Sequence, residues 1–440
     1  MRRPSEAAWR RFAIVARLVA RIYGGYKFIQ LTTRLGWPGA RARYARHDRR
    51  SARAVYRMAI RLEGLPIKAC QFLGARADVL PADYVRILSQ LQDRVPPRAF
   101  AVVVAAVERE LGRPWRAAFA ELDPAPLASA SLAQVHRGRL LDGREVAIKV
   151  QYPNIARLVA IDLRNFAFLV RVLARLEPDF DFRIIIDEVE KYVPLELDFE
   201  NEANNAERMR RMLAARRDVV VPGVVRELST TRLLVMDYEP GVRLTDVGAL
   251  RQLGVDPKDV ARRLLEVFCD PILIHGFFHA DPHPGNVLVR RDGRMVLLDF
   301  GLAKDLAPEF PAGIARLTVA IMSGDRAAVA GAFRALGFKT RDDSDESLWW
   351  LGEAFLGWTL RNKRSYADRE LVDLVNAEMP RIMRANPIVE LPGDILLIGR
   401  VLGLLSGISK QLSSEVDVAA VLMPYLGKVM VGGTEPERMG

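Results

Sequence analysis

The chain has 440 residues, half of them apolar, so it is too long for one compact core and too hydrophobic for a disordered polypeptide. Its two cysteines, Cys70 and Cys269, are too few for a disulfide framework, which leads us to expect a reducing, cytosolic setting. No uncharged apolar run reaches the roughly eighteen residues of a membrane span, so we expect the chain not to cross a bilayer.

The positive charge is confined to the N-terminal segment. Residues 1–60 hold 15 Lys and Arg against 2 acids, a balance of +13, which leaves 50 against 52 in the rest of the chain. A helical repeat of apolar residues runs through this segment, with arginines between them. The apolar positions are Phe12, Val15, Val19, Ile22 and Tyr26, and the arginines are Arg10, Arg17 and Arg21. This pattern predicts a basic amphipathic helix, weakened at Gly24-Gly25.

Two interpretations of this helix stay open. It could lie on an anionic membrane surface, where each basic residue contributes about 1 kcal/mol. It could equally pack on the main domain and leave its basic face in water. Nucleic acid is not an expected partner, because the segment lacks a recognisable binding module.

Helical patterns and strand patterns then alternate along the chain. Residues 50–95 read as helices, and from about 121 to 153 the residues alternate between apolar and polar, with a hairpin turn at Asp142-Gly143. Helical spacing follows to about 215, then two short strands to about 240, then mostly helices. A small sheet followed by a larger helical unit predicts an α+β protein with two lobes.

An alanine-rich segment opens the strand region. Residues 128–135 read A-S-A-S-L-A-Q-V, which keeps the spacing of the glycine-rich loop G-x-G-x-x-G-x-V but has alanine at each glycine position. A hairpin follows, and V-A-I-K, residues 146–149, falls on its second strand. Lys149 therefore occupies the position of a phosphate-binding lysine, which needs a carboxylate partner to hold it.

An acidic segment can supply that partner. The stretch E-L-D-F-E-N-E-A-N-N offers Glu196, Asp198, Glu200 and Glu202. On a helix Asp198 and Glu202 would share one face, so more than one carboxylate could reach the lysine. The alternative is an acidic helix face in water.

A histidine-rich stretch, H-G-F-F-H-A-D-P-H-P-G-N-V-L-V, spans residues 275–289. Its histidines, His275, His279 and His283, would stack on one face of a continuous helix as a metal site. The prolines within the stretch argue against that helix. We therefore expect a loop that leads into a strand, with His279 in a structural role.

On that loop, polar residues follow the order used for phosphoryl transfer. Asp281 and Asn286 are five residues apart, and Asp299-Phe300-Gly301 comes thirteen residues after Asn286. Asp281 could accept a hydroxyl proton or position water, while Asn286 and Asp299 could hold Mg²⁺ at the phosphates of ATP.

Together these motifs resemble the UbiB/AarF family of atypical kinases, protein-kinase-like ATPases linked to ubiquinone and other isoprenoid lipids. The resemblance covers residues 60–425 and includes H-A-D-P-H-P-G-N, L-L-D-F-G and the E-x-D motif of Glu196 and Asp198. It also includes the family's K-x-G-Q segment, matched by Lys68 and Gln71. Cys70 replaces the glycine of that segment, at a cost of roughly 1 to 2 kcal/mol if its φ is positive, and Gly74 replaces a serine. We expect the local helix to be kept.

The resemblance implies a bilobal protein-kinase-like fold with an added N-terminal helical extension. The expected segments are a basic helical part (1–60), a K-x-G-Q extension over the cleft (61–120), an N-lobe (121–240), a C-lobe core (241–345) and a C-terminal helical part (346–440). Lys149, Asp281 and Glu202 would be catalytic, Asn286 and Asp299 would bind metal, and Lys68, Gln71, Glu196 and Asp198 would be regulatory. The expected nucleotide contacts, besides Lys149, are Ala128, Ser129, Ala130, Ser131, Ala133, Val135, Ala147, Met236, Asp237 and Tyr238.

The implied function is Mg-ATP binding with slow hydrolysis, or transfer to a small or lipid acceptor. The protein would be a peripheral membrane protein of the cytoplasm, with isoprenoid or quinone lipids and a lipid-biosynthesis complex as partners. In the family the K-x-G-Q helices fold across the cleft and would occlude the site to a protein substrate, so the resemblance disfavours phosphorylation of other proteins. Two alternatives stay open, a small-molecule phosphotransferase of the aminoglycoside-kinase type and a nucleotide-binding pseudokinase scaffold.

Overall fold

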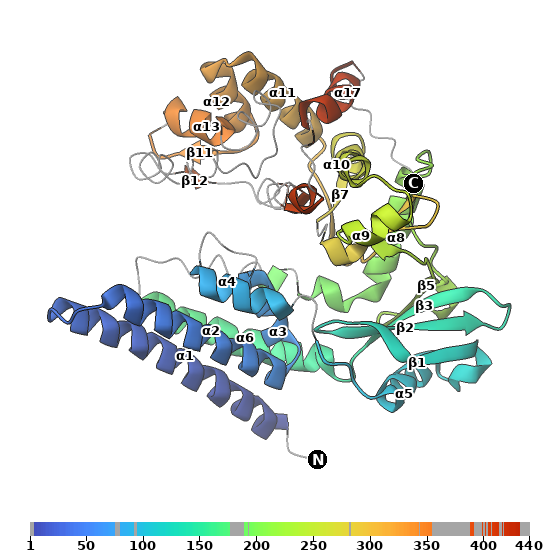
Figure 1. Ribbon diagram of the computed structural model, residues 1–440, viewed down its shortest axis with the longest axis horizontal. Helices are drawn as coiled ribbons and strands as arrows, with labels where there is room; N and C mark the ends of the chain where they lie inside the picture. Colours follow the sequence, from blue (N-terminus) through green and yellow to red (C-terminus); the bar gives the residue numbers. More distant parts are fainter. Residues whose placement is uncertain are drawn as a thin grey trace. The chain divides into compact units, whose positions relative to one another are not determined.

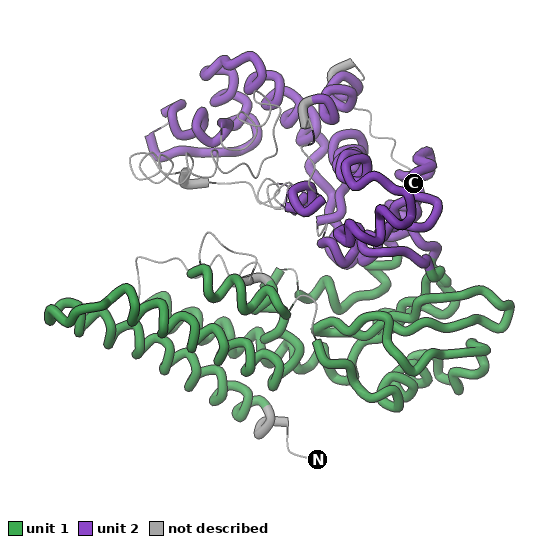
Figure 2. The backbone as a smooth tube through the Cα atoms, in the orientation of Figure 1, with its two compact units in different colours: residues 1–203, 224–238 green, residues 204–223, 239–440 purple. Residues whose placement is uncertain are grey.

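The structure is a computed structural model, and two compact units divide the chain (Figure 2). Unit 1 comprises residues 1–203 and 224–238, and unit 2 comprises residues 204–223 and 239–440. The structure describes residues 4–74, 80–91, 95–176, 189–191, 193–280, 283–342, 344–353, 388–390, 398, 401, 404–405, 407–412, 416 and 418–431.

Unit 1 begins with a helical hairpin. Helices α1 (Pro4–Arg34) and α2 (Ala40–Leu62) run side by side with α6 (Ile155–Leu176) (Figure 1). Helix α1 is continuous through Gly24-Gly25, so the low helix propensity of these glycines does not break it. A Cβ atom on Gly25 would lie 2.2 Å from Cε1 of His47, so this glycine lets the two helices approach closely.

Two short helices complete the N-terminal extension. These are α3 (Leu65–Gly74) and α4 (Ala82–Leu88), which share a buried core with α2. The core contains Ala52, Ala59, Ile67, Cys70, Tyr84, Ile87, Leu88, Leu91 and Val95. Because most of these residues come from three helices, the extension has a hydrophobic core of its own.

The sheet of unit 1 has four antiparallel strands in the order β1-β2-β3-β5. They are β1 (Phe119–Ser129), β2 (Ala133–Leu140), β3 (Glu145–Gln151) and β5 (Leu233–Asp237). Helix α5 (Phe100–Leu111) packs on one face of this sheet through Val103, Ala106 and Val107. Gly143 has a φ of +89°, as expected for the Asp142-Gly143 turn between β2 and β3.

Helix α8 (Phe199–Met212) follows the acidic segment and runs from unit 1 into unit 2. In unit 2 a second four-stranded sheet has the order β4-β9-β8-β6. Its strands are β4 (Val219–Val220), β6 (Val242–Arg243), β8 (Val287–Val289) and β9 (Met295–Leu297). The two short strands expected between about residues 215 and 240 therefore belong to different sheets. The first is β4, which pairs with β9, and the second is β5, which pairs with β3 in unit 1.

The remaining elements of unit 2 are mostly helices. They are α9 (Val247–Gln252), α10 (Pro257–Leu273), α11 (Phe310–Ser323), α12 (Arg326–Ala335), α13 (Asp345–Gly352) and α17 (Val418–Val431). Two strand pairs accompany them, β7 (Phe277–His279) with β10 (Ala303–Asp305), and β11 (Lys339–Thr340) with β12 (Ile388–Glu390). No helix in the described part of the chain is both long and apolar enough to span a membrane.

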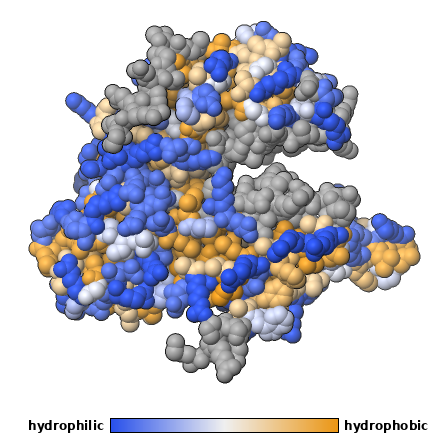
Figure 3. All heavy atoms as spheres, turned by 180° about the vertical axis from the view of Figure 1, so that it is seen from behind, coloured by the Kyte–Doolittle hydropathy of each residue, from blue (hydrophilic) through white to orange (hydrophobic). Residues whose placement is uncertain are grey.

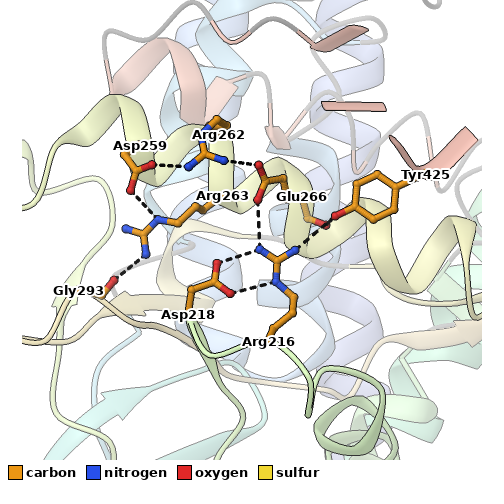
Figure 4. Close-up of polar contacts among 8 residues, drawn as sticks. All are labelled: Arg216, Asp218, Asp259, Arg262, Arg263, Glu266, Gly293 and Tyr425. Carbon is orange, nitrogen blue, oxygen red and sulfur yellow. Dashed lines mark hydrogen bonds and ion pairs between the residues drawn. The ribbon is translucent and has the colours of Figure 1, made fainter. Parts of the chain in front are cut away.

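A charged network joins α10 to the chain ahead of β4 and to α17 (Figure 4). The Arg216 guanidinium donates to the Asp218 carboxylate at 2.8 and 3.1 Å, to Glu266 at 3.2 Å and to the Tyr425 hydroxyl at 3.3 Å. Burial alone would raise the pKa of Asp218, but Arg216 holds it below its usual value. The network forms part of the wall of a pocket of about 1040 Å³ between α10 and α17.

Candidate functional site

Lys149 and Glu202 form a close ion pair in unit 1. On β3 the side chains alternate, so that Val146, Ile148 and Val150 face the core and Lys149 lies on the other face. The Lys149 Nζ donates to both carboxylate oxygens of Glu202, at 2.7 and 2.8 Å. Glu202 is only 1% exposed, and an ammonium this close offsets the cost of burying its charge. The expected partner of the lysine is thus the glutamate of α8.

The start of α8 explains how Glu202 reaches the lysine. The Asp198 carboxylate accepts hydrogen bonds from the backbone N–H groups of Glu200 and Asn201, at 3.1 and 3.2 Å. The Phe199 N–H bonds to the Thr231 carbonyl, and the Phe199 side chain is buried. Asp198 therefore precedes the helix and caps it, because a short side chain satisfies N–H groups that lack partners within the helix. The expectation that Asp198 and Glu202 share one helix face was wrong, because Asp198 lies before the first residue of α8.

The alanine-rich loop is a tight, packed turn between β1 and β2. Ala128 pairs with Val135 across the strands, and the Ala130 N–H bonds to the Ala133 carbonyl at 2.9 Å. Ser131 and Ala133 are buried, and the Ser129 hydroxyl lies 2.9 Å from that of Tyr152.

Leu132 anchors the centre of this loop. Its side chain is buried in a cluster with Leu65 of α3 and with Ile155 and Val159 of α6. Its carbonyl accepts the Tyr152 N–H at 3.0 Å. The loop is therefore held at its middle as well as at its two strands.

The remaining nucleotide candidates of unit 1 lie where β3 pairs with β5. Ala147 is opposite Met236, and Val146 is opposite Asp237. The Tyr238 N–H donates to the Glu145 carbonyl at 3.0 Å, and the Arg137 guanidinium lies over the Tyr238 ring. Ala147 and Met236 also share an apolar cluster with Ala133 of β2. The structure thus brings the alanine-rich loop, β3 and the end of β5 onto one sheet.

The K-x-G-Q counterpart lies on α3. Lys68 forms an ion pair with Glu196, both half-buried, and the Gln71 side chain donates to the Leu91 carbonyl at 2.8 Å. Cys70 lies within this continuous helix, so the local helix is kept and the strain of a positive φ does not arise. Burial raises the pKa of the Cys70 thiol to about 12.

In unit 2, Asn286 and Asp299 flank the β8–β9 hairpin. Val287 pairs with Leu297, and the Leu298 N–H bonds to the Asn286 carbonyl at 2.8 Å. This register places both residues at the same end of the hairpin. Asp299 has a φ of +58°, a conformation that non-glycine residues rarely adopt and that often accompanies functional sites.

Contacts on either side of Asp299 hold the segment in place. The Asn205 amide donates to the Phe300 carbonyl at 3.0 Å, and the Gly301 N–H donates to the Asp299 carboxylate at 3.3 Å. His279 is buried, with its ring beside those of Phe268 and Phe300 and its Nε2 3.2 Å from the Leu298 carbonyl. These contacts fit the structural role expected for His279.

The three histidines do not lie on a continuous helix, because β7 spans Phe277–His279 and a 3₁₀ turn spans Pro284–Asn286. Among the described residues no group of three or more His, Cys, Asp or Glu side chains could hold a metal ion. Asp281, the expected catalytic base, lies outside the described residues.

Sequence reasoning missed three polar residues that support these segments. The first is Asn205. The Asn204-Asn205 pair in the sequence could have indicated it, because asparagine is a poor helix former that favours side-chain hydrogen bonds. The other two are Gln134 and His136 of β2. Both are buried, and their Nε2 atoms lie 2.9 Å apart. The Gln134 oxygen accepts the Arg98 N–H at 2.9 Å, and His136 Nδ1 lies 2.7 Å from the Asp123 carbonyl. Gln134 thus joins β2 to the segment before α5, and His136 joins β2 to β1.

An antiparallel sheet with a lysine–glutamate pair, followed by a helical unit with a D-F-G segment at a hairpin, defines a protein-kinase-like α+β fold. The family model for the ABC1 atypical kinase-like domain matches residues 90–333. The chain therefore belongs to the ABC1 atypical kinase-like family, which confirms the resemblance to UbiB/AarF proteins and the expected fold class.

Curated relatives carry kinase names. The chain is 33% identical over 372 residues to the probable serine/threonine-protein kinase abkD of Dictyostelium discoideum, covering 83% of this chain and 53% of the relative. It is 38% identical over 281 residues to the AarF domain-containing protein kinase 1 of Xenopus tropicalis, covering 63% and 54%. The chain thus spans about half the length of these two relatives.

A solved structure has a similar fold. It is the complex of Rv3197 with erythromycin from Mycobacterium tuberculosis, with a TM-score of 0.62 and 25% sequence identity. The match covers 80% of this chain and 89% of that one.

Proposed function

We propose that the protein is an ATP-dependent atypical kinase or ATPase of the UbiB type, which binds Mg-ATP and supports ubiquinone or other isoprenoid-lipid metabolism at a membrane surface. The observation that carries this proposal is the contact of Lys149 with both oxygens of the buried Glu202. A lysine held in this way is oriented to bind the α- and β-phosphates of ATP. A purely structural lysine would not explain the alanine-rich loop and the nucleotide candidates of β5 on the same sheet.

The other roles follow from the chemistry of each side chain. Asn286 and Asp299 present amide and carboxylate oxygens, which are the hard donors that Mg²⁺ prefers. A bound Mg²⁺ would neutralise charge on the phosphates. Asp281 would accept the hydroxyl proton of the acceptor or position water. The residues of the alanine-rich loop, with Ala147 and Met236–Tyr238, would contact the nucleotide.

Several features disfavour phosphorylation of other proteins. The A-P-E tripeptide at residues 307–309 begins only six residues after Gly301, which leaves too little chain for an activation loop that supports a docked peptide. Alanine also has less backbone freedom than glycine, so the loop should hold phosphates differently from an ordinary kinase loop. A small or lipid acceptor, or water, suits such a site better. Lys68, Gln71, Glu196 and Asp198 would regulate access from the N-terminal extension.

The test is ATP hydrolysis by the purified chain with Mg²⁺, with and without isoprenoid lipids or anionic liposomes. The Asp299→Asn variant should lose activity at least about a hundredfold, since it removes a charge placed to stabilise the transition state. Asp292→Asn is the matched control, because it makes the same change at the turn between β8 and β9. Equal rates for the wild type and Asp299→Asn would contradict the metal role.

A further inference from the structure

An exposed apolar surface lies at the end of the α1–α2 hairpin. We define the hairpin tip as residues 27–43, which comprise the end of α1, the turn and the start of α2. Phe28, Leu31, Leu35 and Trp37 are 60%, 56%, 67% and 55% exposed there. Single exposed apolar residues are ordinary, but four large ones within ten positions form a patch of the kind that marks an interaction site. Hydrophobic residues gather at this end of the hairpin in Figure 3.

The apolar side chains of the tip are held outward. Phe28, Leu31 and Leu35 are spaced by three and four residues, so they form one stripe on α1, whereas Ile29 and Thr32 are buried. The turn is fixed by a hydrogen bond from the Trp37 N–H to the Thr32 carbonyl, at 2.9 Å.

A side chain from α2 closes the turn. The Arg43 guanidinium donates to the Trp37 carbonyl at 3.2 Å and to the Thr33 hydroxyl at 3.1 Å. Gly36 and Gly39 supply the left-handed conformations that the turn needs, with φ of +81° and +75°. This ordered turn keeps the stripe in contact with solvent.

The charge around the tip has a single sign. Residues 7–47 contain nine Lys and Arg and no Asp or Glu. Lys27, Arg34, Arg41 and Arg43 belong to the tip itself. An apolar patch surrounded by positive charge is complementary to a surface that is apolar inside and negative outside.

Part of the apolar face of α1, for which membrane contact and packing on the protein were both open, packs within the protein. The Phe12 ring packs edge-on against Phe168 of α6, with centroids 5.7 Å apart. Arg11 forms an ion pair with Asp162 of α6 and donates to the Leu62 carbonyl. The Phe12 end of that face therefore packs against α6. Arg10, Arg17 and Arg21 are exposed, as in the alternative of a packed helix with a solvated basic face.

We propose that the hairpin tip inserts into an anionic lipid bilayer. The four apolar side chains enter the interface, and Lys27, Arg34 and Arg41 lie at the level of the headgroups. The proposal rests on the membrane part of the proposed function and assigns it to a surface. A second copy of the chain is a poorer occupant, because it would bring two patches of like charge together.

The test is sedimentation of the full chain with vesicles of phosphatidylcholine, with or without phosphatidylglycerol. The variant Leu35→Ser/Trp37→Ser should lower the partition coefficient on anionic vesicles at least about tenfold, since two large apolar side chains no longer enter the bilayer. Leu141→Ser is the matched control, because Leu141 is 64% exposed at the turn between β2 and β3. Its binding should stay within about twofold of the wild type.

A second variant and an optical readout isolate the two contributions. Arg34→Glu/Arg41→Glu keeps the apolar patch and should remove the preference for anionic vesicles. Bromine-labelled lipids should quench wild-type tryptophan emission, and Trp37→Phe should lose most of that quenching. Unchanged binding of Leu35→Ser/Trp37→Ser would overturn the proposal, as would a concentration-dependent dimer that this variant abolishes.

Failure of the tip and failure of the proposed enzyme give different results. If the wild type hydrolyses ATP but binds no vesicle, the tip proposal is overturned and the enzyme proposal stands. If vesicle binding depends on the tip but Mg-ATP is not hydrolysed, the tip proposal is supported and the enzyme proposal fails.

Discussion

Lys68 of α3 is joined by an ion pair to Glu196, six residues ahead of the glutamate that holds Lys149. The N-terminal extension and the candidate nucleotide site are therefore both linked to the short segment from Glu196 to Glu202. Both side chains of the pair are less than a fifth exposed, so solvent screens their attraction only in part.

A double-mutant cycle on this pair should give a clear coupling energy. Lys68→Met and Glu196→Gln are each expected to destabilise the protein, because each removes one charge of a half-buried ion pair. The double variant should lose less than the sum, with a coupling of about 1 to 2 kcal/mol in urea unfolding. Strict additivity would show that the pair contributes nothing to the docking of α3.

The Lys149–Glu202 pair should show a larger effect of the same kind. Lys149→Met removes the ammonium that both oxygens of the buried Glu202 carboxylate contact, at a cost of about 3 to 5 kcal/mol. The double variant Lys149→Met/Glu202→Leu should recover much of that stability, while ATP hydrolysis stays abolished in both. Chemical unfolding with parallel activity assays checks this expectation. Recovered hydrolysis in the double variant would contradict the proposed role of Lys149.

The two cysteines should be inert in the native protein. Burial raises the pKa of Cys70 and of Cys269 to about 12, so only about one thiol in ten thousand is ionised at pH 8. A thiol reagent at this pH should modify neither residue in the folded protein and both in denaturant. Rapid labelling of Cys70→Ser, which retains only Cys269, would show that the α10 site opens readily.

Asp218 and Asp162 should affect stability in opposite directions as the pH changes. Arg216 lowers the folded-state pKa of Asp218, so its contribution is complete above the unfolded value of about 4 and is lost as the pH falls through the folded pKa. The stability difference between the wild type and Asp218→Asn should therefore be constant near neutral pH and should shrink in acid.

Asp162 provides the comparison, because burial raises its pKa and Arg11 offsets only part of this rise. Wild-type protein should gain stability relative to Asp162→Asn as the pH falls through the raised pKa, since the folded state then binds the proton more tightly. Urea unfolding of both variants across the acid range checks the two signs. The same pH trend for both variants would contradict the opposite pKa shifts of Asp218 and Asp162.

Much of unit 1 could be predicted from local patterns. The alternating strands, the Asp142-Gly143 turn and the position of Lys149 on β3 all follow from residues close together in the sequence. The partner of Lys149 could be narrowed to four acids, but choosing Glu202 required the resemblance, because periodicity does not say where a helix begins. Asp198 caps α8, and that cap determines which glutamate lies on the inner face.

Other features depend on contacts between distant residues, which local patterns do not contain. Arg11 meets Asp162 across 151 positions, and β4 pairs with β9 across about 75. The hairpin tip was missed because a hydrophobic pattern cannot distinguish a face that packs from one that stays exposed. The division into five segments and the catalytic, metal and regulatory roles stay predictions.

The packing of Leu132 gives the alanine-rich loop a mechanical connection to α3. Before any ligand arrives, the loop has already lost most of its conformational entropy, so binding requires little further ordering. The same contact couples the order of the loop to the order of α3. A change that loosens α3 would release the loop as well, and the extension could then tune ligand affinity without touching the ligand.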